Sequence, residues 1–125
     1  MKEEGMAILN RKTVREMLDM GLSEADFIEQ VIELSHIYHW KCAHFRPART
    51  ATGWKTPVAG DGAGFPDLVL VHEGRKELLW VELKSEKGSI RPEQREWHRA
   101  LRIIGERVYV WRPSQWQQLE EVLKG

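Results

Sequence analysis

The sequence predicts a single α/β domain, and three observations support this prediction. The chain has 125 residues, 42% of them hydrophobic, which is enough for one domain with its own core. Apolar residues recur at helical spacing in some segments and form short continuous runs, typical of buried strands, in others. Glycine and proline separate these segments. The predicted order is a helix, three strands, a helix, a strand and a helix.

The first helix is expected to begin after Ser23, a good N-cap residue, and to extend to about Tyr38. A first strand should follow over residues 40–45. We therefore assign residues 1–22 to an N-terminal extension of unknown role and residues 23–125 to the domain itself. The apolar face of the first helix consists of Phe27, Val31, Leu34 and Tyr38.

The central strands are expected over residues 67–72 and 78–84, joined by a tight turn at residues 73–76. Their continuous apolar runs favour a sheet that is covered on both faces. The preceding residues 46–66 are rich in proline, glycine, alanine and threonine, and we interpret them as one long loop.

The second half of the chain supplies the remaining helices and strand. Pro92 fits the first turn of a helix that extends to Ile104 and ends at Gly105. A strand is expected over residues 107–111, and Ser114 is expected to cap the last helix. The buried stripe of the Pro92 helix is predicted to consist of Trp97, Leu101 and Ile104.

Composition excludes several classes of protein. The single cysteine rules out a disulfide framework and a cysteine-based zinc cluster, and it favours a reducing, cytoplasmic location. No apolar run is long enough to span a membrane, and the N-terminus lacks a signal-peptide pattern. The chain shows no motif for an organic cofactor. These features leave a cytoplasmic protein without a membrane partner as the expectation.

The net charge is zero, but the charges are unevenly distributed. Residues 41–112 contain fourteen basic and nine acidic side chains, whereas residues 1–40 contain four basic and eight acidic ones. A basic region in a neutral protein is typical of a phosphate-binding surface, although a solvated surface with uneven charge gives the same pattern. Zero net charge therefore does not exclude a nucleic-acid partner.

The most informative motif is Asp67 followed, after fourteen residues, by Glu82 and Lys84. Side chains two apart in a strand point to the same face, so Glu82 and Lys84 should project together. Asp67 lies at the same open end of the predicted hairpin, so its carboxylate should approach Glu82. Two carboxylates and the backbone carbonyl of Leu83 are oxygen ligands that suit a hard cation such as Mg²⁺ or Mn²⁺.

This triad also has a simpler interpretation, because Asp67 could merely begin a strand and Glu82 with Lys84 could form an ion pair at an edge. Glu82, however, lies within an otherwise apolar strand, where an unpaired acid is costly. A cation bound there would polarise a phosphodiester and lower the pKa of a bound water. Lys84 could orient that water or offset negative charge in the transition state.

The chain resembles the VRR-NUC domain, a branch of the PD-(D/E)XK nuclease superfamily, in particular its small stand-alone phage and bacterial members. The resemblance covers about residues 23–116 and implies a restriction-endonuclease-like core, a mixed central β-sheet flanked by helices. It also implies a Mg²⁺- or Mn²⁺-dependent DNA nuclease in a bacterial or phage-infected cell, acting as a homodimer on branched DNA such as Holliday junctions. It rests on Gly64-Phe65-Pro66-Asp67-Leu68, Glu82-Leu83-Lys84, Lys87-Gly88, Gln94-x-x-Trp97 and Val108-Tyr109-Val110-Trp111.

The resemblance assigns roles to individual residues. Asp67 and Glu82 match the metal-binding acids, and Lys84 matches the catalytic lysine. Glu24 occupies the place of the family's helix glutamate, although a first-turn Glu that complements the helix dipole is an equal alternative. Gln94 matches the motif glutamine and should point inward to a metal-bound water or a phosphate, unless it only caps the turn before its helix.

Basic and aromatic residues around this motif are candidates for DNA contacts, although any single one of them could be a solvated charge. His44 could instead be a partly buried strand histidine. Trp54 could stack on a base or anchor the loop. The candidate phosphate contacts are His44, Arg46, Arg49, Lys55, Lys87 and Arg91.

Three other interpretations remain open at this level. One is a plain α/β structural subunit, which leaves the buried acid Glu82 unexplained. A nicking, flap-cutting or end-acting repair or packaging nuclease would carry the same motif. A non-cutting DNA-binding module would keep the fold, but it has no need for acids that repel phosphates without a cation.

Overall fold

The computed structural model describes residues 22–45, 48–50, 53–55 and 60–125, and for residues 48–50 and 53–55 it describes the backbone only. Ser23 begins the first described helix as predicted, because its hydroxyl oxygen accepts a hydrogen bond from the Asp26 N–H. In chain order the elements are α2 (Glu24–Ile37), β1 (Lys41–His44), β2 (Ala48–Thr50), β3 (Gly53–Lys55), β4 (Leu68–His72), β5 (Glu77–Leu83), α3 (Pro92–Ile103), β6 (Arg107–Trp111), the 3₁₀ helix η1 (Pro113–Gln115) and α4 (Trp116–Lys124).

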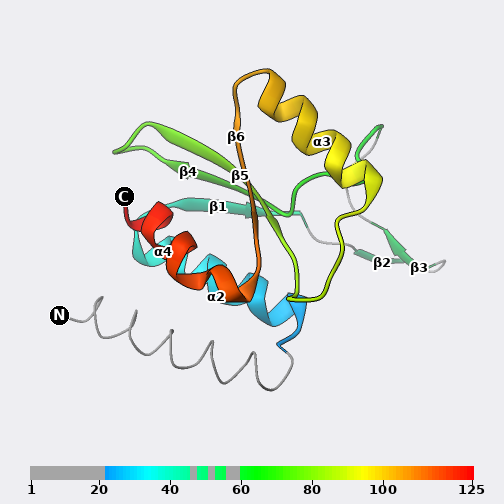
Figure 1. Cartoon of the computed structure of the whole chain (residues 1–125), viewed down its shortest axis with the longest axis horizontal. Helices are drawn as coiled ribbons and strands as arrows, with labels where there is room; N and C mark the ends of the chain where they lie inside the picture. The colour runs from blue at the N-terminus through cyan, green and yellow to red at the C-terminus, as the bar shows by residue number, and fades with distance from the viewer. Residues whose placement is uncertain (1–21, 46–47, 51–52, 56–59) are drawn as a thin grey trace.

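A four-stranded mixed sheet forms the centre of the domain, with the order β1-β4-β5-β6 (Figure 1). β1, β4 and β5 pair antiparallel, and Leu68 lies opposite Val81 in the β4–β5 pair. β6 pairs parallel with β5, because the chain crosses over through α3 before it returns to the sheet. The α/β fold with a mixed sheet and flanking helices is therefore confirmed.

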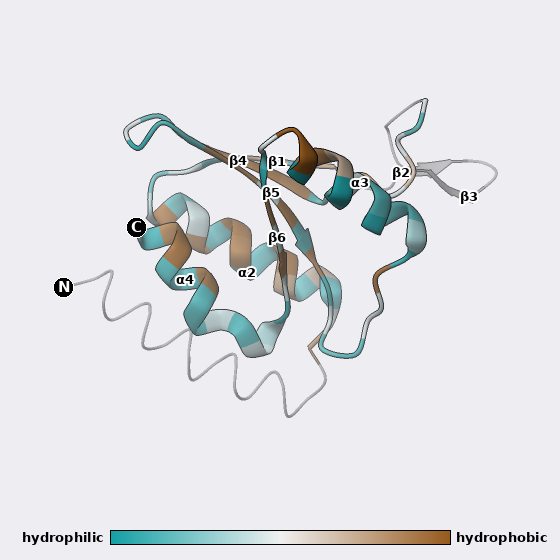
Figure 2. Cartoon of the chain, turned by 45° about the horizontal axis from the view of Figure 1, so that its top comes forward, coloured by the Kyte–Doolittle hydropathy of each residue, from teal (hydrophilic) through white to brown (hydrophobic). Residues whose placement is uncertain are grey.

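Helices lie on both sides of this sheet: α2 and α4 on one side and α3 on the other (Figure 1). The core is formed between the sheet and the α2–α4 pair, whose apolar surfaces face inward (Figure 2). Ten of its side chains are at most 1% exposed: Phe27, Val31, Leu34, Leu68, Leu70, Leu79, Val81, Leu83, Leu119 and Leu123.

The opposite face of the sheet is less completely covered than its apolar runs predict. Val69 and Val71, which alternate with the core residues of β4, are only partly buried. On β5 this second face carries Trp80 and Glu82, with Lys84 directly after the strand. Among the described helices only α3 covers this face, and the polar residues of the motif lie beneath it.

Three sequence-based expectations about elements are wrong. Residues 46–66 are not one uninterrupted loop, because β2 and β3 form a small antiparallel ribbon within them. Ile104 is not part of the buried stripe of α3, because it follows the last helical residue and is 74% exposed. Ser114 does not cap the last helix, because it lies inside η1, where Gln115 accepts a hydrogen bond from the Arg112 N–H.

Within the described part of the chain, the helices are all too short or too polar to cross a lipid bilayer.

Candidate functional site

Asp67 and Glu82 meet on the face of the sheet that α3 covers. Since Leu68 lies opposite Val81, the antiparallel register brings Asp67 to the level of Glu82. The backbone N–H of Leu83 donates a 2.8 Å hydrogen bond to Asp67 Oδ2 and fixes that carboxylate against β5. Glu82 is fully buried, with 0% of its surface exposed.

The two carboxylates perturb one another strongly. Burial, followed by the charge of Glu82 and a hydrogen bond with it, raises the pKa of Asp67 from its ordinary 3.8 to about 7. Burial also raises the pKa of Glu82, against the hydrogen bond with Asp67 and the charge of Lys84. Without a cation the pair therefore retains a proton near neutral pH, because two adjacent buried carboxylates cannot both ionise at low cost.

Lys84 projects to the same side as Glu82, as the two-residue spacing predicts. Its Nζ lies 3.9 Å from Glu82 Oε2, and only 9% of its side chain is exposed. The backbone N–H of Lys84 donates to the carbonyl of Trp111 on β6 at 3.0 Å, so this residue is anchored from the neighbouring strand. A buried ammonium beside an acid pair offsets part of its charge and is available to a reacting group placed next to it.

The Gln94 side chain both points inward to Glu82 and caps the start of α3. Its Nε2 donates to Glu82 Oε2 at 3.1 Å, and its Oε1 accepts a hydrogen bond from the Arg91 N–H at 2.9 Å. The side chain therefore closes the first turn of α3 and holds one oxygen of Glu82. The partner of its amide nitrogen is Glu82, whereas the sequence suggested a metal-bound water or a phosphate.

Glu24 lies at the rim of this cluster, at the start of α2. It is partly exposed, and burial raises its pKa. The charges of Lys84, Asp67 and Arg91 also act on it, which places Glu24 within electrostatic range of the motif residues. The first turn of α2 therefore contributes a third carboxylate near the acid pair.

The glycine of the motif allows the Asp67 segment to pack against α3. Gly64 has a φ of +83°, and a Cβ there would lie 2.5 Å from the carbonyl carbon of Glu93 and 2.6 Å from the Gln94 nitrogen. The next residue, Phe65, packs edge-on against Trp97 at 4.9 Å and Trp80 at 5.5 Å between ring centroids. These contacts join the segment before β4 to the helix that carries Gln94.

His98 is a site residue that the sequence did not reveal. It is 2% exposed, and its Nε2 lies 3.6 Å from Glu82 Oε1. Neither of these two atoms has a hydrogen-bond partner among the described residues. One feature of the sequence indicates its place: His98 follows Gln94 by four residues, and residues four apart share a helix face.

The candidate DNA contacts are only partly described. His44 is partly buried at the end of β1, and Lys87 is exposed in the segment before α3. Arg91 is exposed, lies 3.1 Å from Glu93 and acts electrostatically on Glu24 and Glu82. Arg46 lies outside the described residues, and the side chains of Arg49 and Lys55, like that of Trp54, are outside the description too.

The carboxylates of Asp67 and Glu82 and the carbonyl of Leu83 are oxygen donors that suit a hard cation. In a strand the N–H and C=O of one residue point to the same neighbour, so the Leu83 carbonyl is directed to the Asp67 side. These donors would leave the other coordination positions of the cation to water or phosphate. Mg²⁺ usually binds in this way, through one or two carboxylates together with waters and phosphate oxygens. In the part of the chain that the structure describes, no group of three His, Cys, Asp or Glu side chains has a geometry that would hold a metal by itself.

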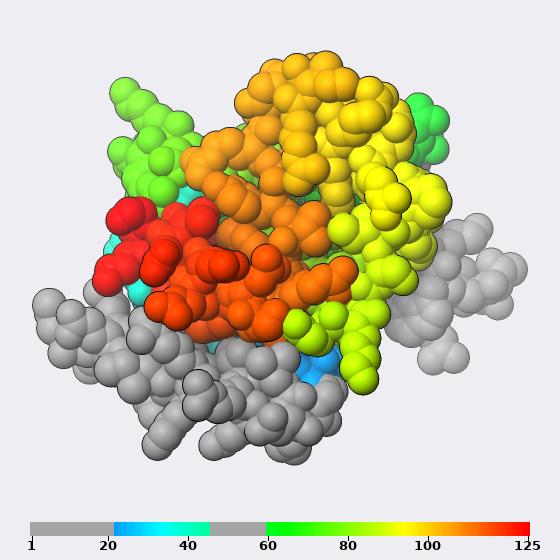
Figure 3. Space-filling model, viewed as in Figure 1, coloured from blue at the N-terminus to red at the C-terminus, as the bar shows by residue number. Residues whose placement is uncertain are grey.

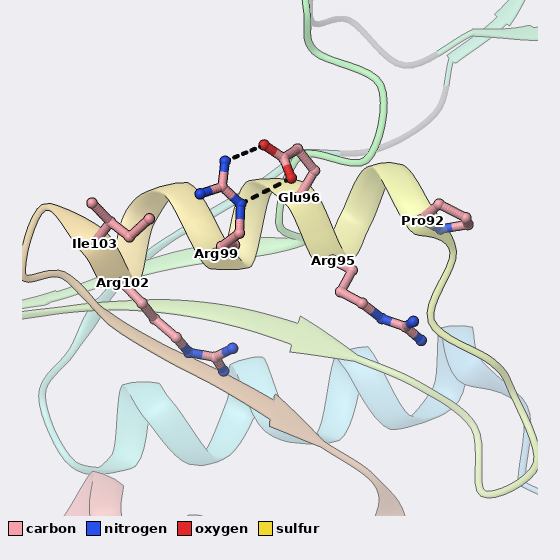
Figure 4. Close-up of a pocket in the computed structure, with 6 residues that line it drawn as sticks. All are labelled: Pro92, Arg95, Glu96, Arg99, Arg102 and Ile103. Carbon is pink, nitrogen blue, oxygen red and sulfur yellow. Dashed lines mark hydrogen bonds and ion pairs between the residues drawn. The ribbon is translucent and has the colours of Figure 1, made fainter.

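The outer surface of α3 is basic and lies apart from the acid pair. Its side chains form the upper edge of the molecule in Figure 3. Figure 4 shows Arg95 and Arg102 on one side of the helix, with the paired Glu96 and Arg99 on the other. Arg102 donates to the Val108 carbonyl at 3.1 Å. The hollow that these residues line with Pro92 and Ile103 contains none of the motif residues.

Comparison with known protein families gives a match over most of the chain. A family model described as the VRR-NUC domain matches residues 10–115. This range includes every motif residue described above and begins within residues 1–22, the segment that the sequence assigned to an extension. No curated protein and no solved structure matches the chain.

Proposed function

The chain belongs to the VRR-NUC family, nuclease domains of the PD-(D/E)XK superfamily, and on this premise we propose that it is a metal-dependent DNA endonuclease. The observation that carries the proposal is the buried pair of Asp67 and Glu82 with Lys84 beside it. A buried acid pair of this kind is costly without a compensating cation, and no core-packing role requires it.

Asp67, Glu82 and the Leu83 carbonyl would hold Mg²⁺ or Mn²⁺. When bound, such a cation polarises the scissile phosphodiester and makes water a nucleophile near neutral pH. The Leu83 N–H keeps Asp67 in place, and Gln94 holds Oε2 of Glu82. These contacts fix the ligands before substrate arrives, so little reorganisation is needed at the moment of reaction.

We propose that Lys84 orients the attacking water and offsets the negative charge that develops on the phosphoryl oxygens. Its ammonium lies 3.9 Å from Glu82 Oε2, beside the acid pair that would hold the cation. Glu24, at the rim, would add a third acidic side chain to the cluster around the cation. We expect both residues to affect turnover more than substrate binding.

We propose branched DNA such as Holliday junctions as the substrate and a homodimer as the active form. Support comes from the resemblance to the small stand-alone family members, since two active sites in one dimer could reach both strands of a junction. Lys87 and Arg91 are exposed before and at the start of α3, where they would contact phosphates of the bound arm.

Cleavage of a four-way junction, a flap and a linear duplex, each with Mg²⁺, Mn²⁺, Ca²⁺ or EDTA, tests this proposal. We expect junction cleavage with Mg²⁺ or Mn²⁺ only, and a loss of about 100-fold or more in Lys84→Ala. Lys76→Ala is the matched control, because Lys76 is an exposed lysine in the turn at the other end of the β4–β5 hairpin.

Each outcome bears on a separate part of the proposal. Absence of cleavage with both Mg²⁺ and Mn²⁺ would overturn the enzymatic function. Full activity of Lys84→Ala would overturn the assigned mechanism, and preference for flaps or ends would replace the junction with another substrate. Light scattering that finds a monomer both with and without junction DNA would exclude the homodimer.

A further inference from the structure

We propose that His98 is a positioning residue for the metal-binding acid Glu82, which it holds through a hydrogen bond from its Nε2–H to Glu82 Oε1. This inference rests on the proposed function and adds to it a residue that the motif does not contain. His98 would act through Glu82 and would not itself contact substrate or metal.

The first evidence is the pair of buried atoms that face each other. Glu82 Oε1 and His98 Nε2 are both buried and both without a hydrogen-bond partner among the described residues. They lie 3.6 Å apart, so a shift of a few tenths of an ångström brings them within the usual limit of about 3.2 Å. Buried polar atoms in folded proteins are almost always satisfied, and each atom is the available partner of the other.

The second evidence is the division of contacts at Glu82. Its Oε2 accepts from Gln94 Nε2 at 3.1 Å and lies 3.9 Å from Lys84 Nζ. Its Oε1 faces His98. Gln94 and His98 are one turn apart on the inner face of α3, so the helix can hold the two oxygens of one carboxylate from two successive turns.

If Glu82 binds a cation, the Nε2 atom of His98 must carry a hydrogen. Glu82 must be ionised to ligate a metal, and an ionised carboxylate can only accept hydrogen bonds. His98 Nε2 must then be the donor. Partners that orient metal ligands in this way contribute about 10- to 100-fold to metal affinity in other metalloproteins.

Mn²⁺ binding to the full chain, measured by calorimetry or by electron paramagnetic resonance without DNA, tests the inference. His98→Leu keeps the bulk of the ring but removes the donor, and we expect its Mn²⁺ affinity to fall by about 10- to 100-fold. In His98→Gln the amide nitrogen reaches the position of Nε2, so the affinity should stay within about threefold of wild type. The shorter His98→Asn cannot reach Glu82 and should behave like His98→Leu.

Leu101→Ala is the matched control for a purely structural effect. Leu101 is buried on the same face of α3, one turn further from Glu82, so its truncation loosens the helix without removing a donor. We expect it to lower the melting temperature of the metal-free protein and to leave Mn²⁺ affinity unchanged. Melting curves of all four variants identify any that do not fold, and the Gln variant keeps the test decisive if the Leu variant unfolds.

Failure of the inference and failure of the proposed function are distinguishable. If wild type binds Mn²⁺ and His98→Leu binds it equally well, His98 has no positioning role and the metal site stands. The role is also overturned if His98→Gln binds as weakly as His98→Leu. If wild-type protein binds no Mn²⁺ and cuts no DNA with it, the proposed function fails and this inference fails with it.

Discussion

Gln94 donates a hydrogen bond to Glu82 at 3.1 Å through the same side chain whose oxygen caps the first turn of α3 at 2.9 Å. One residue thus joins the start of a helix to the buried acid of the candidate active site. A change that loosens this helix end should therefore also release Glu82.

Replacing Gln94 with alanine tests this connection. The variant loses the cap and leaves Oε2 of Glu82 without its amide donor, so we expect about 1–3 kcal/mol lower stability and at least tenfold weaker cleavage. Gln115→Ala is the matched control, because Gln115 caps the Arg112 N–H at the same 2.9 Å in η1. Urea unfolding should show destabilisation in both variants, whereas a loss of cleavage by Gln115→Ala would contradict the prediction.

Gly64 gives a second matched pair of variants. A Cβ at Gly64 would lie 2.5–2.7 Å from the backbone of Glu93 and Gln94, whereas one at Gly60 would meet nothing within 4 Å. Both glycines have positive φ, +83° and +68°, so both alanine variants incur the same kind of backbone strain. We expect Gly60→Ala to cost about 1 kcal/mol and Gly64→Ala clearly more, with lower activity, because Asp67 and α3 must separate. Equal melting temperatures for the two variants would show that this packing is unimportant.

Much of the fold could be predicted because local patterns determine it. The strand period of two correctly places Glu82 and Lys84 on one side, away from the core residue Leu83. The 3.6-residue period of α2 correctly identifies the buried face that includes Phe27 and Val31. These predictions depend only on neighbours along the chain, and neighbours along the chain are what a sequence displays.

The sequence-based predictions are wrong or incomplete where contacts between segments distant in the chain determine the structure. His98 is missed from sequence because its position one turn after Gln94 becomes informative only through its contact with Glu82 on another element. The apolar character of Ile104 predicts a core position, but the helix ends before it and its side chain is exposed. The cap at η1 follows from Pro113, which starts a tight turn three residues before α4.

The acid pair predicts how the stability of the metal-free protein depends on pH. Asp67 has a pKa of about 7 in the folded chain and an ordinary value of 3.8. The folded state therefore binds more protons between these values, and stability should fall as the pH rises from about 4 to 7. Asp67→Asn removes this titration and the repulsion of Glu82, and its amide oxygen can still accept from Leu83.

We expect metal-free Asp67→Asn to melt several degrees above wild type at pH 8 and close to wild type at pH 4.5. Mg²⁺ should raise the melting temperature of wild type at pH 8 and leave that of Asp67→Asn nearly unchanged. Thermal unfolding with EDTA or Mg²⁺ across this pH range provides the measurement. A wild-type melting temperature that rises from pH 4.5 to pH 8 in EDTA, with Asp67→Asn showing the same rise, would contradict this account of the acid pair.

Arg91 should contribute to DNA binding through one phosphate contact beside the acid pair. It is exposed, and its charge already acts on Glu24 and Glu82, so a phosphate bound near these acids lies within its range. Arg91→Ala should weaken binding of a four-way junction several-fold and reduce the slope of log affinity against log salt by about one.

Lys41→Ala is the control for Arg91→Ala, because Lys41 is an exposed cation paired with Glu73 near the hairpin turn. Fluorescence anisotropy in Ca²⁺ at several salt concentrations measures both effects. An unchanged salt slope in Arg91→Ala would exclude the phosphate contact, because neutralising one phosphate must release its condensed counterions whatever the DNA sequence.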